Sequence, residues 1–261
     1  MSRKETVSIK YSCNPDFPEF ERDISNIGNI FSHSTTSIHK ARNELRIVTL
    51  HGIETVVKSF KVPHRLNRIV YSHLRAGKAF KSYHNALRLT DLGVSTPTPV
   101  AYIEFHTDGL LKESYYLSVY APYDFTIRDA LHHKIDDYDA VLRAFAAYTY
   151  DLHQKGVWHL DYSPGNILIK RLEEGYLFNI VDINRMEFKT ISPIEGCENF
   201  NKLWAKDEDI EIMGREYARL SGVDETIAVS EMKRHNDANK RIKNFKKWLK
   251  ALLRGDFSTP V

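Results

Sequence analysis

One segment, residues 152–169 (LHQKGVWHLDYSPGNILI), constrains this chain more than any other. It contains His159 and Asp161 in a His-x-Asp pattern, then Asn166, and it ends in an apolar run typical of a strand. Asp182 stands directly after the next apolar run. Each of these polar residues alone could be a turn residue, a cap or a hydrogen-bond acceptor at the end of a strand. Their occurrence together, in this order, favours a catalytic set.

With Lys58 at the end of the upstream run TVVK, the set resembles the residues of the protein-kinase-like fold, and this resemblance implies phosphoryl transfer. That reaction needs a positioned γ-phosphoryl group and neutralised charge more than covalent help. Asp182 and Asn166 offer the hard oxygens that Mg²⁺ prefers, and Lys58 offers a positive charge to phosphate oxygens. Asp161 can orient the attacking hydroxyl and accept its proton. We expect His159 to order the loop by hydrogen bonding.

The ordered set resembles the strand lysine, catalytic loop and metal-binding aspartate of the protein-kinase-like fold. The resemblance implies a two-lobed α+β fold, with a β-rich N-lobe around one main helix and a helical C-lobe. Residues 1–121 would be the N-lobe, which holds the nucleotide phosphates. Residues 122–261 would be the C-lobe, with the catalytic loop and metal site, in one kinase-like domain. ATP and Mg²⁺ are the implied cofactors, with the adenine against the connector at Tyr120 and Ala121.

A narrower likeness rests on four further segments, Lys78–Tyr83, Asn85–Leu89, Leu92–Ile103 and Ser114–Ser118. With the Leu-His-x-x-Gly-Val-x-His-x-Asp loop, they make the chain similar to the bacterial lipopolysaccharide kinase family, which includes Kdo and heptose kinases. The likeness runs from about Arg42 to Arg185. It implies an ATP-dependent kinase that phosphorylates a sugar hydroxyl of the lipopolysaccharide inner core, with Kdo on Kdo–lipid A as the expected acceptor. Such an enzyme would work at the cytoplasmic face of the inner membrane.

Three features depart from the general kinase pattern. Kinases pair the strand lysine with a helix glutamate, but no acid occurs between Glu54 and Asp91. The Asp-Phe-Gly triplet is replaced by Asp182-Ile183-Asn184. The glycine-rich loop is missing, and residues 32–37, SHSTTS, would take its place. These losses leave a catalytically silent kinase fold open as an alternative.

The hydrophobic pattern predicts the remaining elements. Apolar, β-branched runs predict strands at Leu45–Leu50, Thr55–Phe60, Pro99–Phe105 and Tyr115–Tyr120, with turns at His51-Gly52 and Asp108-Gly109. Apolar residues at helical spacing predict helices at about Leu66–Leu92 and at Asp139–Gln154, and mostly helix from Asp207 onward. Short strands are predicted at Ile167–Ile169 and Phe178–Val181.

Basic residues are concentrated in two segments. Residues 55–90 hold eight basic residues and no acid, and residues 232–254 hold nine basic residues and one acid, although the whole chain has a net charge of only +3. This segregation points to an anionic partner, for which we expect a lipid-linked sugar acceptor and an anionic inner-membrane surface. The second segment also carries an apolar stripe, Ile242, Phe245, Trp248, Leu249, Leu252 and Leu253. We expect this stripe to pack on its own lobe, with a membrane contact as the alternative.

Composition excludes several classes of protein. Hydrophobic residues make up 42% of the chain and charged residues 27%, which is typical of a globular protein. No apolar run approaches a membrane span, and the N-terminus lacks the apolar region of a secretory signal. The two cysteines form no CxxC pair, so we expect a cytoplasmic protein without structural zinc. The tyrosines do not alternate with basic residues, and we expect no nucleic-acid partner.

Three functions remain open at this point. The first is a lipopolysaccharide-core sugar kinase, a phosphotransferase with an alcohol group as acceptor, peripheral on the cytoplasmic face of the inner membrane. The second is a silent kinase fold that binds an anionic glycolipid or a partner protein. The third is a cytosolic small-molecule phosphotransferase.

Overall fold

The computed structural model of the chain describes residues 6–40, 43–61 and 76–253. The chain forms two compact units, Met1–Pro122 with Asn179–Arg185, and Tyr123–Phe178 with Met186–Val261. The predicted division at residue 121 therefore needs one correction, because the segment that carries Asp182 groups with the first unit. The reason is local hydrogen bonding, in which Ile180 N donates to Ser95 O and Thr96 Oγ1 donates to Ile180 O.

Unit one is built on a six-stranded sheet in the order β1-β5-β6-β4-β3-β2, with neighbouring strands antiparallel. The strands are β1 (Val7–Cys13), β2 (Ser37–Lys40), β3 (Glu44–Leu50), β4 (Ile53–Ser59), β5 (Pro99–Thr107) and β6 (Leu110–Val119). The helices are η1 (Pro18–Asn26), a 3₁₀ helix, α1 (Ile27–His33) and α3 (Lys78–Asp91).

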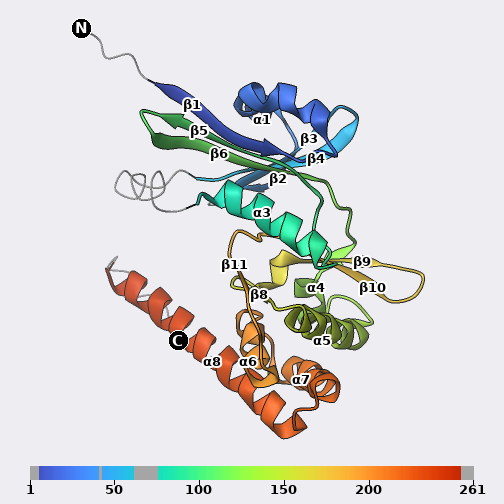
Figure 1. Cartoon of the computed structure of the whole chain (residues 1–261). Coiled ribbons are helices and arrows are strands. Elements are labelled where there is room, and N and C mark those ends of the chain that lie inside the picture. The colour runs from blue at the N-terminus through green and yellow to red at the C-terminus, as the bar shows by residue number, and fades with distance from the viewer. Residues whose placement is uncertain (1–5, 41–42, 62–75, 254–261) are drawn as a thin grey trace. The chain divides into compact units, whose positions relative to one another are not determined.

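The helices of unit one cover both faces of this sheet (Figure 1). Side chains alternate between faces along a strand, so neighbouring residues of β5 pack against different helices. Ile103 belongs to the buried cluster that contains Phe20 of η1 and Phe31 of α1. Tyr102 instead packs against Phe80 of α3, with ring centroids 5.3 Å apart. The same alternation places Val57 of β4 in the first cluster and Lys58 on the face that α3 covers.

The predicted strands of the first half are confirmed, with ends that differ by a few residues. His51 and Gly52 form the β3–β4 turn with φ angles of 50° and 80°, and Gly93 ends α3 with a φ of 65°. The helix predicted from Leu66 is observed from Lys78, with Gly77 as its N-cap, and residues 62–75 lie outside the described part of the chain.

Unit two contains short strands and most of the helices. The strands are β7 (Phe125–Thr126), β8 (Val157–His159), β9 (Ile167–Arg171), β10 (Tyr176–Ile180), whose last two residues belong to unit one, and β11 (Met186–Phe188). The helices are α4 (Ile127–Leu131), α5 (Tyr138–Gln154), η2 (Pro164–Asn166), α6 (Pro193–Glu198), η3 (Asn199–Lys202), α7 (Asp207–Ser221) and α8 (Glu225–Leu253).

Helix α5 forms the centre of the core of unit two. Val141, Leu142 and Phe145 are fully buried on its apolar face, as the periodicity predicts. Phe145 packs against Phe200 of η3, with ring centroids 6.0 Å apart. After α5, β8 pairs with β11, so that His159 lies opposite Met186. This pairing fixes the start of the segment that contains Asp161.

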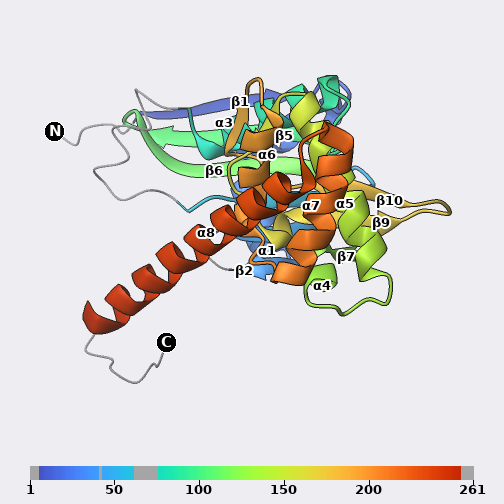
Figure 2. The ribbon, with the colours of Figure 1, turned by 90° about the horizontal axis from the view of Figure 1, so that it is seen from below.

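Helix α8 is docked over its first half only. Ala228 and Met232 are fully buried, and Lys240 Nζ donates to Ala205 O at 2.8 Å. From residue 241 to 250 every residue is exposed. Figure 2 shows this second half extending beyond α6 and α7 of the same unit. The expectation that the apolar stripe packs on its own lobe is therefore wrong for the described side chains.

None of the helices in the described residues combines the length and the low charge that crossing a bilayer requires.

Candidate active site

Lys58 and Asp182 are brought together in unit one, although 124 residues separate them. Lys58 Nζ lies 2.5 Å from Asp182 Oδ1, and the lysine is only 8% exposed. Asn184 Nδ2 donates to the same carboxylate oxygen at 2.6 Å. Asp182 has a φ of 56°, a backbone conformation that is costly for a residue other than glycine and that is concentrated at functional sites. Asn184, which replaces the usual glycine of the triplet, holds the Asp182 carboxylate through this hydrogen bond.

Helix α3 holds this segment without the missing glutamate. Asn85 Nδ2 donates to Ile183 O at 2.6 Å, and Ile183 itself is 3% exposed. The helix thus contacts the backbone next to Asp182, while Lys58 takes Asp182 as its charged partner. The sequence indicated that Lys58 had no acidic partner on the helix, but nothing in it pointed to Asn85.

His159, Asp161 and Asn166 lie together in unit two. Asp161 N donates to His159 Nδ1 at 3.0 Å, and Asn166 Nδ2 donates to Asp161 O at 2.9 Å. The neighbouring Tyr162 is fully buried, and its hydroxyl lies 2.9 Å from Thr149 Oγ1 of α5. These contacts hold a tight loop on which the Asp161 carboxylate is 37% exposed. His159 has an ordering role in this geometry, because it is 1% exposed and one ring nitrogen accepts from the loop.

A neutral hydrogen-bond network supports the loop from behind. Asn199 Nδ2 donates to His159 O at 3.0 Å, and His153 Nε2 lies 3.2 Å from Asn199 Oδ1. Because that oxygen accepts, His153 Nε2 carries the proton and Nδ1 accepts from the Tyr217 hydroxyl, 2.8 Å away. Burial lowers the pKa of His153 to about 4, so the network stays uncharged at neutral pH.

Lys202 is a candidate site residue that motif spacing does not reveal. Its Nζ lies 3.6 Å from Asp161 Oδ1 and donates a short hydrogen bond to Leu160 O. It stands at the end of η3, far along the chain from Asp161, so only the fold brings the two together. A cation here holds the carboxylate in place and adds positive charge beside it.

The connector residues Tyr120 and Ala121 end the first unit. Tyr120 N donates to Glu54 O at 2.8 Å, so this amide already takes part in the pairing of β6 with β4. The adenine contact predicted for the connector would therefore use the Ala121 amide and the carbonyl groups. Residues 32–37 also need a correction. They end α1 and begin β2, which pairs with β3, and residues 41–42 between these strands lie outside the described part of the chain.

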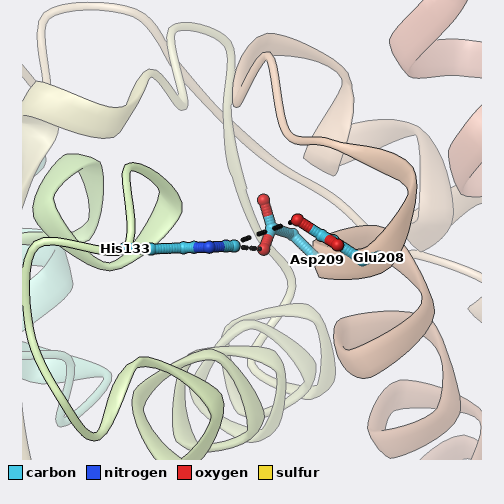
Figure 3. A group of neighbouring side chains, drawn as sticks. All are labelled: His133, Glu208 and Asp209. Carbon is cyan, nitrogen blue, oxygen red and sulfur yellow. Dashed lines mark hydrogen bonds and ion pairs between the residues drawn. The ribbon is translucent and has the colours of Figure 1, made fainter.

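A separate polar cluster in unit two joins His133 to Glu208 and Asp209 (Figure 3). His133 Nε2 lies 2.8 Å from Asp209 Oδ1 and 3.8 Å from Glu208 Oε1. The other oxygen of the fully buried Asp209 accepts the Lys206 N–H at the start of α7. Because both oxygens of Asp209 already accept hydrogen bonds, this cluster is explained as a helix cap braced by His133.

Comparisons with known proteins found one matching family model and similar solved structures. The family model described as "Lipopolysaccharide kinase (Kdo/WaaP) family" matches residues 60–223. The solved structure of WaaP in complex with acyl carrier protein is 16% identical, with a TM-score of 0.59, and the match covers 88% of this chain and 99% of WaaP. The Mycobacterium tuberculosis PknI kinase domain, solved as a cysteine-to-alanine mutant, is 12% identical, with a TM-score of 0.40, over 72% of this chain and 73% of that one. No curated protein sequence matches the chain.

The WaaP match confirms the predicted α+β, protein-kinase-like fold. The family match covers the α3 helix, Tyr120 and Ala121, the loop from His159 to Asn166, and Asp182. Because it spans more than half of the residues, this chain belongs to the lipopolysaccharide kinase (Kdo/WaaP) family and is a phosphotransferase that acts on a sugar hydroxyl.

Proposed function

We propose that this member of the family transfers the γ-phosphoryl group of ATP to a hydroxyl of Kdo on Kdo–lipid A. The observation that supports the proposal most strongly is the Lys58–Asp182 pair, because it brings the predicted phosphate-binding lysine beside the predicted metal-binding carboxylate. Lys58 would bind phosphate oxygens, and Asp161 would orient the sugar hydroxyl and accept its proton. Their retention argues against a silent fold.

The two side chains predicted to hold a magnesium ion, Asp182 of unit one and Asn166 of unit two, each carry suitable oxygen donors. Asp182 offers a carboxylate, and Asn166 offers its amide oxygen because its amide nitrogen already donates to Asp161 O. These are hard oxygen donors of the kind that Mg²⁺ prefers. When bound, the ion supplies positive charge that neutralises phosphate oxygens. The Asp161 loop and Lys202 would meanwhile fix the acceptor hydroxyl.

The direct test uses purified protein with ATP, Mg²⁺ and Kdo–lipid A. We expect ADP release that depends on the acceptor, and a product that has gained one phosphate by mass spectrometry. Heptose-containing core acceptors, assayed in parallel, show whether Kdo or heptose is the sugar that is phosphorylated. Nucleotide binding with no transfer to any of these acceptors would instead support the silent fold.

We expect Lys202→Met to reduce kcat by roughly 10²-fold, because it removes an electrostatic group that contacts the Asp161 carboxylate. Lys202→Arg keeps the charge and should recover much of the rate. The measurement is steady-state ADP release for both variants, with unfolding curves to check the fold. Equal losses in the two variants would show that Lys202 matters only for packing, not as a charged positioning residue.

We also propose that the protein binds an anionic membrane surface through the second half of α8. Five apolar side chains at helical spacing are 39–59% exposed there, namely Ile242, Phe245, Trp248, Leu249 and Leu252. Residues 241–252 include five basic residues and no acid. In the described part of the chain, no carboxylate forms an ion pair with these five cations. An exposed apolar stripe with lysines on the opposite face is the pattern of a helix lying in a membrane interface.

We expect the double variant Phe245→Gln, Trp248→Gln to lose binding to vesicles that contain anionic lipid, because each buried aromatic contributes about 1.5–3 kcal/mol. Ile227→Gln is the matched control, since Ile227 is 48% exposed on the same helix but stands outside the stripe. Sedimentation with vesicles measures both. If the double variant and the control sediment alike, α8 is not the membrane contact.

Arg65, Arg68 and Arg75 belong to the basic segment of residues 55–90, for which we expect a contact with the anionic membrane surface. They lie outside the described residues, so that contact stays a prediction from the sequence.

A further inference from the structure

Unit two contains a pocket of about 340 Å³ beside the catalytic loop. Pro164, which stands between Asp161 and Asn166, forms part of its wall. The other lining residues come from α4 and its end, and from the segment that follows Lys202, namely Arg128, Leu131, His132, Leu203, Trp204 and Lys206. Ligand pockets span about 300–1,000 Å³, so this one is suited to about one sugar unit rather than to a whole glycolipid.

Arg128 brings a positive charge to the loop itself. A Cβ atom built on Gly165 would lie 2.8 Å from Arg128 Nη2, so the absence of a side chain at Gly165 is what lets the guanidinium approach the loop backbone. In the part of the chain that the structure describes, Arg128 has no ion pair or side-chain hydrogen bond. Lys206, the second cation of the pocket, is paired with Glu208 at 3.2 Å. The site therefore offers one uncommitted guanidinium to an anionic group.

Trp204 forms an aromatic wall of the pocket and has a strained backbone conformation. It is 47% exposed, whereas its neighbours Leu203 and Ala205 are 2% and 1% exposed. Its φ of 59° is in the left-handed region, which a bulky side chain rarely adopts. The strained turn directs the indole outward between two buried anchors. Strain of this kind persists where the surrounding structure imposes it, and it is concentrated at binding sites.

We infer that this pocket binds an acidic sugar of the acceptor, with the sugar ring against Trp204 and its carboxylate or phosphate at Arg128. The inference rests on the proposed function, because the acceptor hydroxyl must reach Asp161. The apolar C–H face of a sugar ring can pack on an indole, and a guanidinium binds a carboxylate or phosphate with two parallel hydrogen bonds. The wall shared with the catalytic loop would set the distance between the bound acid group and the hydroxyl that is phosphorylated.

The kinetic test compares Arg128→Gln and Trp204→Gly with the parent. Glycine suits the backbone at position 204, so this variant removes the indole and relieves the strain together. We expect each variant to raise the KM for Kdo–lipid A about tenfold or more, with the KM for ATP little changed. Lys170→Gln is the control, since Lys170 is an exposed cation of the same unit outside the pocket. An unchanged acceptor KM in an active enzyme would overturn the inference.

A binding test separates this inference from the proposed reaction. Saturation-transfer NMR on free Kdo, without ATP, observes the ligand rather than the tryptophan. We expect Kdo to bind the parent and Lys170→Gln, to bind Arg128→Gln more weakly, and to lose contact with Trp204→Gly. That pattern without any phosphate transfer would support the pocket and reject the proposed reaction. Two results together would overturn the sugar assignment: inorganic phosphate displaces all bound Kdo, and Trp204→Gly binds Kdo as well as the parent does. The pocket would then be a general anion site.

Discussion

The Asp161→Asn variant is expected to bind ATP normally and to transfer almost no phosphate. Asparagine has the size of aspartate and leaves the backbone bonds to His159 and Asn166 in place. It cannot accept the proton of the sugar hydroxyl, and a positioned base contributes roughly 10²–10⁴-fold to the rate. The measurement is single-turnover phosphate transfer to Kdo–lipid A, with ATP affinity measured separately.

Asp139→Asn provides the control for this experiment. Asp139 is a half-exposed carboxylate on α5 of the same unit, paired with Arg143 one helical turn away. Such surface pairs are worth about 0.3–0.5 kcal/mol, so its loss should not change the rate. An Asp161→Asn enzyme that turns over near the parent rate would show that another group accepts the proton.

Asp182→Ala is expected to abolish magnesium-dependent nucleotide binding, and Asn166→Ala to weaken it less. A carboxylate brings a full negative charge to the metal, whereas an amide brings only a dipole. Nucleotide titrations with and without Mg²⁺ measure the difference. If the Asp182 variant kept the full dependence on Mg²⁺, Asp182 would not be the metal ligand.

The Asp182 variant also removes the partner of Lys58, so its fold must be checked. Removing the partner of a nearly buried charge destabilises the fold, and Lys58 is 8% exposed. Asp182→Asn, which keeps a hydrogen-bond acceptor near Lys58 Nζ, should fold better but still bind the metal poorly. Lys58→Met with Asp182→Ala removes both charges and serves as the stability control.

The loop that brings His159, Asp161 and Asn166 together could be predicted because all three residues belong to one short sequence motif. His159, Asp161 and Asn166 lie within one short segment and hydrogen-bond to one another. The strands on either side of His51-Gly52 were equally clear, since a tight turn between β-branched runs specifies a hairpin. Asp182 was found by its spacing, but its grouping with the first unit depends on contacts to Ser95 and Thr96 that no pattern shows.

The N-terminal elements were missed although a signal was present. Phe20, Ile24, Ile27 and Phe31 recur at helical spacing, and all four are buried under the sheet. This periodicity does not indicate one regular helix, because η1 has 3₁₀ geometry, with Pro18 at its start and Gly28 just beyond its end. Strand β1 was missed because it is an exposed edge strand. Val7, Ile9 and Tyr11 do not form a buried apolar face, so the strand lacks the usual hydrophobic signal.

Residues that depend on tertiary contacts could not be predicted. Lys202 reaches Asp161 only through the packing of η3, and Arg128 reaches Gly165 only through the position of α4. The exposure of the apolar stripe on α8 could not be predicted either. Its periodicity would be the same for a packed helix and an exposed one. The stripe is exposed because the contacts between α8 and the rest of unit two stop near Lys240.

The proposed transfer of one phosphate to a Kdo hydroxyl of the lipopolysaccharide inner core can be followed by mass spectrometry of lipid A–core. The cells to compare are those with the parent gene, without it, and with the Asp161→Asn allele. We expect one phosphate on Kdo in the first strain and its loss in the other two. An unchanged lipid A–core in all three strains would contradict the proposal.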